Sequence, residues 1–196
     1  MNFKRLAWLT AFLLSATFAA PITIIYTSSG SGSIGSTTFT NATFTITELL
    51  DTANRQSFLG GYSVDDTSAS IAIAGVGTFN FTTTTRSFVN NLISLAGFSR
   101  GGVNGSDLLY ASANAVLGTW DLTTSIGPIT GTGQLLQWAT PTISTSGGTL
   151  TFSNNRTTTT FQATVGTATP EPSAVSLAWL GLAGISWMIR RRRVPL

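Results

Sequence analysis

Apolar and polar residues alternate with a period of two along much of the chain between residues 20 and 165. The pattern is clearest at 71–74 (Ile-Ala-Ile-Ala) and 78–81 (Thr-Phe-Asn-Phe), and Gly75-Val76-Gly77 between them predicts a hairpin turn. Threonine is the usual polar residue, and its β-branched side chain suits the solvated face of a strand. The same alternation predicts further strands at residues 22–27, 42–46, 87–93, 119–123, 134–140, 150–152 and 161–165.

These segments predict an all-β fold. We expect a single β-sandwich or flattened barrel of about eight to ten short antiparallel strands. Glycine pairs at 60–61, 101–102 and 147–148 predict turns between the strands. Residues 112–117 fit one short helical turn, and no other part of this region has a helical period. The alternation does not decide between sandwich and barrel.

The N-terminal residues have the pattern of a secretory signal peptide. Lys4 and Arg5 precede an apolar stretch at 6–14, and small residues follow it at 15–20. Cleavage after Ala19 places the small residues Thr17 and Ala19 at the two positions that signal peptidase requires. We therefore expect residues 1–19 to form a helix that is removed on export.

The C-terminal residues predict a membrane-spanning helix with a motif before it. The uncharged run 173–189 would be about 25 Å long as a helix, close to the ~30 Å of a bilayer core. Four residues that follow the run, Arg190, Arg191, Arg192 and Arg193, are expected to stop transfer and to keep residues 190–196 in the cytoplasm. Three residues that precede it, Pro170, Glu171 and Pro172, favour an extended, exposed segment. An exported domain at 20–165 and a linker at 166–172 complete the predicted organisation.

This order of motif, apolar span and arginine run resembles the PEP-CTERM sorting signal of Gram-negative bacteria. The resemblance implies that a membrane-embedded exosortase cleaves near Pro170-Glu171-Pro172, after signal peptidase has acted at the other end. It also implies transient anchoring in the inner membrane, then a place at the cell surface or in the extracellular biofilm matrix, with exopolysaccharide as a partner. A permanently anchored periplasmic domain is the alternative that needs no exosortase.

Composition limits the chemistry of the exported domain. The formal charge of +3 comes from the two terminal segments, because residues 20–169 contain four arginines, six acidic residues and no lysine. We expect no nucleic-acid partner for a domain without a basic surface. The chain has no cysteine and no histidine, which excludes the usual zinc sites and the Cys-His and Ser-His dyads. We therefore expect no catalytic residue, no metal and no cofactor, and interpret the protein as a non-enzyme.

Two motifs receive structural rather than catalytic interpretations. Gly30-Ser31-Gly32-Ser33-Ile34-Gly35 has the spacing of a dinucleotide fingerprint, but a strand and not a helix is predicted after it, so we interpret it as a flexible loop. The adjacent Asp65 and Asp66 are interpreted as a polar turn, and on a strand they would point to opposite faces. A hydrolase would need two carboxylates facing each other across a cleft.

Aromatic residues provide the main alternative function. Trp120, Trp138 and Tyr110 could stack on sugar rings if they lay together on an exposed face, although aromatic residues of β domains more often belong to the core. Serine and threonine account for 56 of the 196 residues. The sequence therefore predicts an exported structural protein of the extracellular matrix, with a secreted carbohydrate-binding module as the alternative.

Overall fold

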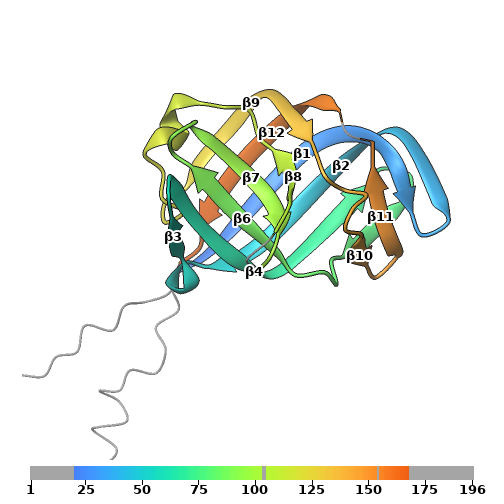
Figure 1. Cartoon of the computed structure of the whole chain (residues 1–196), viewed down its shortest axis with the longest axis horizontal. Helices are drawn as coiled ribbons and strands as arrows, with labels where there is room; N and C mark the ends of the chain where they lie inside the picture. Colours follow the sequence, from blue (N-terminus) through green and yellow to red (C-terminus); the bar gives the residue numbers. More distant parts are fainter. Residues whose placement is uncertain (1–19, 103–104, 154, 168–196) are drawn as a thin grey trace, which may run out of the picture. The chain divides into compact units, whose positions relative to one another are not determined.

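The period-two segments fold as antiparallel strands, and eight of these strands close into a barrel (Figure 1). The computed structural model describes residues 20–102, 105–153 and 155–167. Its strands are β1 (Pro21–Ile34), β2 (Thr37–Asp51), β3 (Gln56–Phe58), β4 (Gly61–Ile73), β5 (Gly77–Asn80), β6 (Thr85–Asn90), β7 (Leu95–Arg100), β8 (Asp107–Tyr110), β9 (Ile126–Leu135), β10 (Ile143–Thr145), β11 (Gly148–Phe152) and β12 (Arg156–Val165). Two short 3-10 helices are η2 (Thr52–Asn54) and η3 (Ala115–Gly118).

The barrel has an up-and-down topology. Its strands follow the order β1, β2, β4, β6, β7, β8, β9 and β12, and β12 pairs with β1 from Ile22↔Val165 to Thr27↔Thr160. Closure pairs both edges of the sheet, so the ring has no free edge strand. The all-β prediction and the barrel alternative are confirmed, and the sandwich alternative is wrong. The longest strands, β1, β2 and β4, have 14, 15 and 13 residues and exceed the expected short length. Seven other strands are short, with three to six residues each.

Four shorter strands extend this ring. β3 pairs with the start of β4 and β5 with its end, and the β4–β5 turn confirms the hairpin predicted at Gly75-Val76-Gly77. The β10–β11 hairpin joins β1 at Gly32–Ile34, beyond the segment of β1 that pairs with β12. These short strands extend the sheet beyond the ring, and the eight-stranded ring itself stays closed.

The two ends of the barrel differ. We call the end where β1 begins and β12 ends the terminal end; there the N–H of Gly166 donates to the carbonyl of Pro21 (2.8 Å). The end with the β1–β2 turn is the opposite end. Figure 1 shows β3 at the terminal end, on the left, and the β1–β2 turn and the β10–β11 hairpin on the right. Both termini of the folded domain therefore leave from one end.

The interior is filled by side chains of alternate residues. Tyr26 and Phe161 meet at 5.2 Å between ring centroids, and Phe44 and Phe152 at 4.7 Å. Trp120 lies against Phe161 at 5.5 Å, in the loop that covers the terminal end. The aromatic side chains therefore fill the interior of the barrel, which contains a packed core rather than an open lumen.

The sequence interpretation of residues 30–35 is wrong. Residues up to Ile34 belong to β1, and the register with β2 shifts between Gly30 and Gly32 as a β-bulge. A Cβ atom at Gly32 would lie 1.9 Å from the carbonyl oxygen of Thr151, so glycine is needed where β11 approaches β1. The glycines therefore serve close strand packing and not a phosphate site.

Two predicted strands are also wrong. Residues 119–123 form a turn, because the Asp121 carboxylate accepts hydrogen bonds from the N–H (3.2 Å) and the hydroxyl (2.5 Å) of Thr123. β9 ends at Leu135, and the residues after it cross the opposite end and insert Trp138 between Phe98 and Phe152. The helical turn expected at 112–117 is confirmed in part by η3.

The predicted signal peptide (1–19) and the predicted span (173–189) lie outside the described residues. Within the described residues, neither 3-10 helix has the length and apolar run that crossing a membrane would require.

Candidate functional site

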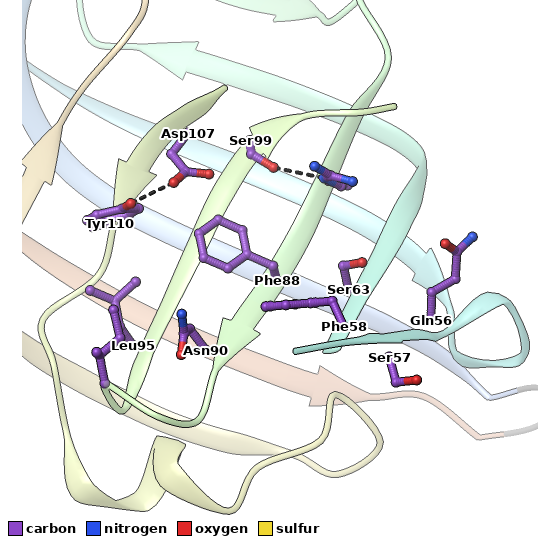
Figure 2. A pocket seen from close by; sticks show the side chains of 12 residues that line it. Gln56, Ser57, Phe58, Ser63, Phe88, Asn90, Leu95, Ser99, Asp107 and Tyr110 are labelled. Carbon is purple, nitrogen blue, oxygen red and sulfur yellow. Dashed lines mark hydrogen bonds between the residues drawn. The ribbon is translucent and has the colours of Figure 1, made fainter. Parts of the chain in front are cut away.

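A groove of about 380 Å³ runs across the outer wall of β4, β6, β7 and β8 and is bordered by β3 (Figure 2). Figure 2 shows Phe88 in the middle of the groove, with Tyr110 towards one side and Phe58 towards the other. Alternation positions these residues, since Arg86, Phe88 and Asn90 of β6 point outward while Thr85, Ser87 and Val89 point into the barrel. The groove therefore presents aromatic rings and polar side chains together.

Two hydrogen bonds hold polar groups in place along this groove. The Tyr110 hydroxyl donates to Asp107 Oδ2 (2.5 Å), and Arg86 Nε donates to Ser99 Oγ (3.2 Å). The rings of Phe88 and Tyr110 meet edge to face, 6.1 Å between centroids. The pKa of Tyr110 rises to about 12, because of partial burial and then because of the bond and charge of Asp107. Tyr110 is therefore a neutral hydrogen-bond donor at any physiological pH. The charged side chains that line the groove are Arg86 and Asp107.

The predicted aromatic face does not form. Trp138 is fully buried and Trp120 nearly so, and both indole N–H groups bond to backbone carbonyls, of Leu108 (2.7 Å) and Thr124 (2.8 Å) respectively. Only Tyr110 of the three residues reaches the surface, in the groove described above. The core interpretation is thus the right one for both tryptophans.

A second cluster of chemical groups lies inside the barrel and was missed at the sequence level. Glu48 of β2 and Asp66 of β4 face the interior near Tyr26 and Ser87. Ser87 Oγ donates to Glu48 Oε2, whereas Tyr26 Oη, Glu48 Oε1 and both Asp66 oxygens have no hydrogen-bond partner among the described residues. The alternation Ile46-Thr47-Glu48-Leu49-Leu50 places Glu48 on the apolar face, and this signal could have identified it.

Burial controls the ionisation of these interior groups. Burial, and then the charge of Asp66, raises the pKa of Glu48 well above its ordinary value. The pKa of Asp66 rises from 3.8 to about 7, again mainly through burial, although contacts with Thr85, Glu48 and the Ser87 backbone favour its charged form. Burial and the charge of Glu48 also raise the pKa of Tyr26. Two adjacent carboxyls in this setting share a proton more readily than both ionise.

The interior pair does not make a hydrolase site. Two carboxylates do come together, as such a site requires, but Glu48 is fully buried and the barrel around it is packed with side chains.

The polar-turn interpretation of Asp65-Asp66 is wrong, since both lie in β4, with Asp65 exposed and Asp66 turned inward. Among the described residues, no three acidic side chains lie close enough to hold a metal ion.

The remaining predicted site residues lie outside the described part of the chain: Ala19, Pro170, Glu171, Pro172 and Arg190 to Arg193. No family model, no curated protein and no solved structure matches this chain.

Proposed function

We propose that this protein is an exported structural component of the cell surface or extracellular matrix, released from the inner membrane through its C-terminal sorting signal. The observation that carries the proposal is the order Pro170-Glu171-Pro172, uncharged run 173–189 and Arg190 to Arg193. Signal peptidase removes residues 1–19, and an exosortase acts near the proline motif. Exopolysaccharide is the partner that this destination supplies.

The fold is compatible with processing at both ends. β1 begins at Pro21, two residues after Ala19, and β12 ends at Val165, five residues before Pro170. The ring closes entirely between these two positions, and Ala19–Thr167 forms one compact unit. Removing the terminal segments would therefore leave every strand of the barrel intact.

A structural role agrees with the chemistry of the domain. The carboxyl oxygens of Asp66 and Oε1 of Glu48 are buried, and the chain has no histidine or cysteine to act as base or nucleophile. Closure leaves none of the eight ring strands at an edge of the sheet, and β3, β5 and β10, which pair on one side, have only three or four residues each. These properties suit a stable matrix component and give no support to catalysis.

Co-expression with an exosortase tests the sorting step. We expect the product to begin at Ala20 and to lose its span and arginine run only when the exosortase is present, as measured by intact mass and C-terminal peptide sequencing. Replacing residues 170–172 by three alanines is expected to leave the span attached in both strains, because the enzyme loses its recognition motif.

Gly166→Ala/Thr167→Ala/Thr169→Ala, in the same linker but outside the motif, serves as the control and should be processed normally. A product that keeps its span in both strains would instead identify a permanently anchored periplasmic domain.

Carbohydrate binding is a second candidate function, and the outer groove favours it. Saccharides combine apolar C–H faces with many hydroxyls, and the groove offers the rings of Phe88 and Tyr110 beside the guanidinium of Arg86 and the amide of Asn90. Because Ser99 and Asp107 orient two of these groups, the binding surface is formed before a ligand arrives.

We expect Phe88→Ala and Arg86→Ala each to weaken binding of a soluble polysaccharide about tenfold, the equivalent of ~1.4 kcal/mol for a lost stacking or charged contact. Titration calorimetry with one neutral and one acidic polysaccharide measures the effect. Arg156→Ala removes an exposed arginine that does not line the groove, and should bind like the unmodified protein. Equal affinity for all three variants would show that the groove is not the binding site.

A further inference from the structure

Large apolar side chains are exposed at the terminal end of the barrel. Among the described residues, seven large hydrophobic side chains are exposed, and five of them belong to loops or short elements at this end: Phe58, Leu59, Leu92, Ile93 and Val116. Leu59 is 96% exposed and Leu92 76% exposed. Such a cluster is costly in water unless something covers it.

Hydrogen bonds join the loops that carry these residues. The N–H of Asn91 donates to the carbonyl of Gly60 (2.7 Å), which connects the β6–β7 turn to the β3–β4 turn. The Asn91 side chain donates to the carbonyl of Leu117 in η3 (2.7 Å), and the N–H of Asn114 donates to Ser94 (2.9 Å). The apolar side chains are therefore presented on one connected surface, which we call the apolar rim.

The opposite end has a different character. Its hairpin turns carry small residues at 35–36 (Gly-Ser) and 146–147 (Ser-Gly), and the turn at 74–76 (Ala-Gly-Val) packs its one larger side chain, Val76, against the core. Figure 1 shows the β1–β2 turn and the β10–β11 hairpin at this end, away from β3. The exposed apolar residues thus mark one end of the barrel specifically.

Charge adds little to the surface around the apolar rim. Arg55, beside η2, and Asp121, after η3, pair with each other at 2.5 Å, and the domain contains no lysine. A partner recognised by this end must therefore be apolar rather than strongly charged. Loop tips with aliphatic side chains as exposed as Leu59 and Leu92 suit the boundary between lipid headgroups and acyl chains.

The short linker after β12 indicates which partner the apolar rim meets. Residues 166–172 span at most about 25 Å when fully extended, whereas the 14 residues of β1 extend about 46 Å along the strand. A domain joined to a span at 173–189 by this linker keeps its terminal end near the bilayer and its opposite end away from it.

We propose that the apolar rim docks on the outer leaflet of the inner membrane, with Leu59, Leu92, Ile93 and Val116 entering the headgroup region. This docking rests on the proposed function, since it takes residues 173–189 as the membrane span. It holds the barrel against the bilayer until the linker is cut, and it presents the proline motif close to a membrane-embedded enzyme.

The absence of cysteine allows a direct test on the full chain. Leu92→Cys at the apolar rim and Ser36→Cys at the opposite end are each labelled with an environment-sensitive nitrobenzoxadiazole dye and reconstituted in phosphatidylethanolamine–phosphatidylglycerol vesicles. We expect a blue shift and a gain in intensity for the dye at 92, and no change for the dye at 36. Equal responses at the two sites would overturn the proposal.

Vesicle flotation of residues 20–167 tests docking without the span, since the barrel closes within this segment. We expect Leu59→Ser/Leu92→Ser/Val116→Ser to lower the partition coefficient roughly 10- to 100-fold, because three exposed aliphatic side chains no longer leave water. Ile25→Ser, an exposed apolar residue on the wall of β1, is the matched control and should float like the unmodified segment.

Binding is expected to be the same in 50 mM and 500 mM salt, because no charged contact contributes. An unmodified segment that does not float, a triple variant that floats equally, or binding only to vesicles that contain the exosortase would overturn the proposal. The C-terminal mass in cells reports the sorting step separately, so failure of docking and failure of sorting are distinguishable.

Discussion

Replacing Trp138 by alanine is expected to lower the free energy of unfolding by about 3–5 kcal/mol, the usual cost of removing a buried indole. Trp138 is fully buried at the opposite end of the barrel. Its ring lies 4.9 Å from Phe152 and 6.2 Å from Phe98, centroid to centroid, and Nε1 donates to the carbonyl of Leu108 (2.7 Å). The substitution removes all three interactions and leaves a cavity that the paired strands cannot collapse to fill.

Thermal unfolding followed by circular dichroism measures this effect, and a loss of this size corresponds to a decrease in Tm of roughly 6–20 °C. Trp138→Phe is expected to cost less, because a ring remains and the Leu108 carbonyl still accepts from the N–H of Leu136 (2.9 Å). Leu59→Ala, at a 96% exposed position, is the control and should change stability by about 0.5 kcal/mol or less. An unchanged Tm for Trp138→Ala would place the indole outside the core.

Strands could be predicted from sequence where apolar and polar residues alternate strongly. They could not be predicted where glycines, required by the close approach of a neighbouring strand, interrupt the alternation. β1, β2 and β4 alternate clearly and were anticipated in part. β9 was largely missed because it contains Pro128, Gly131 and Gly133. A Cβ atom at Gly133 would lie 2.3 Å from Thr159 Oγ1, so this glycine, a strand-breaking signal in sequence, is required by the neighbouring strand.

Ring closure depends on pairing between β1 and β12, at the two ends of the domain. No local pattern contains that information, which is why sandwich and barrel could not be separated. The groove was missed for a similar reason: β3, β4, β6, β7 and β8 all contribute to it, and Tyr110 was the only lining residue with a recognisable signal. The tryptophans were ambiguous because an aromatic residue suits either a core or a sugar platform until its burial is known.

Raising the pH from 4 to 8 is expected to destabilise the barrel through Glu48 and Asp66. Both carboxyls have a raised pKa in the folded state, so the folded protein keeps protons that the unfolded chain releases above about pH 4. Their contribution is fully present below that pH and is lost as the pH rises through the folded pKa, which is about 7 for Asp66. A shift from 3.8 to about 7 corresponds to a loss on the order of 4 kcal/mol.

Within residues 20–102, 105–153 and 155–167, no interior cation pairs with either carboxyl. Arg100 also turns inward, but its Nη2 donates to the carbonyls of Gln137 (2.9 Å) and Pro141 rather than to either carboxyl. Asp66→Asn and Glu48→Gln are therefore each expected to raise stability at pH 8 and to flatten the pH dependence. Urea unfolding between pH 4 and 8 measures both effects.

Asp65→Asn is the matched control, because Asp65 precedes Asp66 on β4 but points to solvent. It should leave most of the pH dependence in place. If Asp66→Asn and Glu48→Gln both kept the slope of the unmodified protein, the two interior carboxyls would not control stability in this pH range.

The double variant tests whether the two carboxyls titrate as one unit. Replacing Asp66 removes a charge that raises the pKa of Glu48, so the gain from replacing Glu48 becomes smaller once Asp66 has been replaced. Glu48→Gln/Asp66→Asn is therefore expected to gain less stability at pH 8 than the sum of the single variants, by about 1 kcal/mol or more. Additive gains would mean that each carboxyl is penalised by burial alone, and the description of a shared proton would then fail.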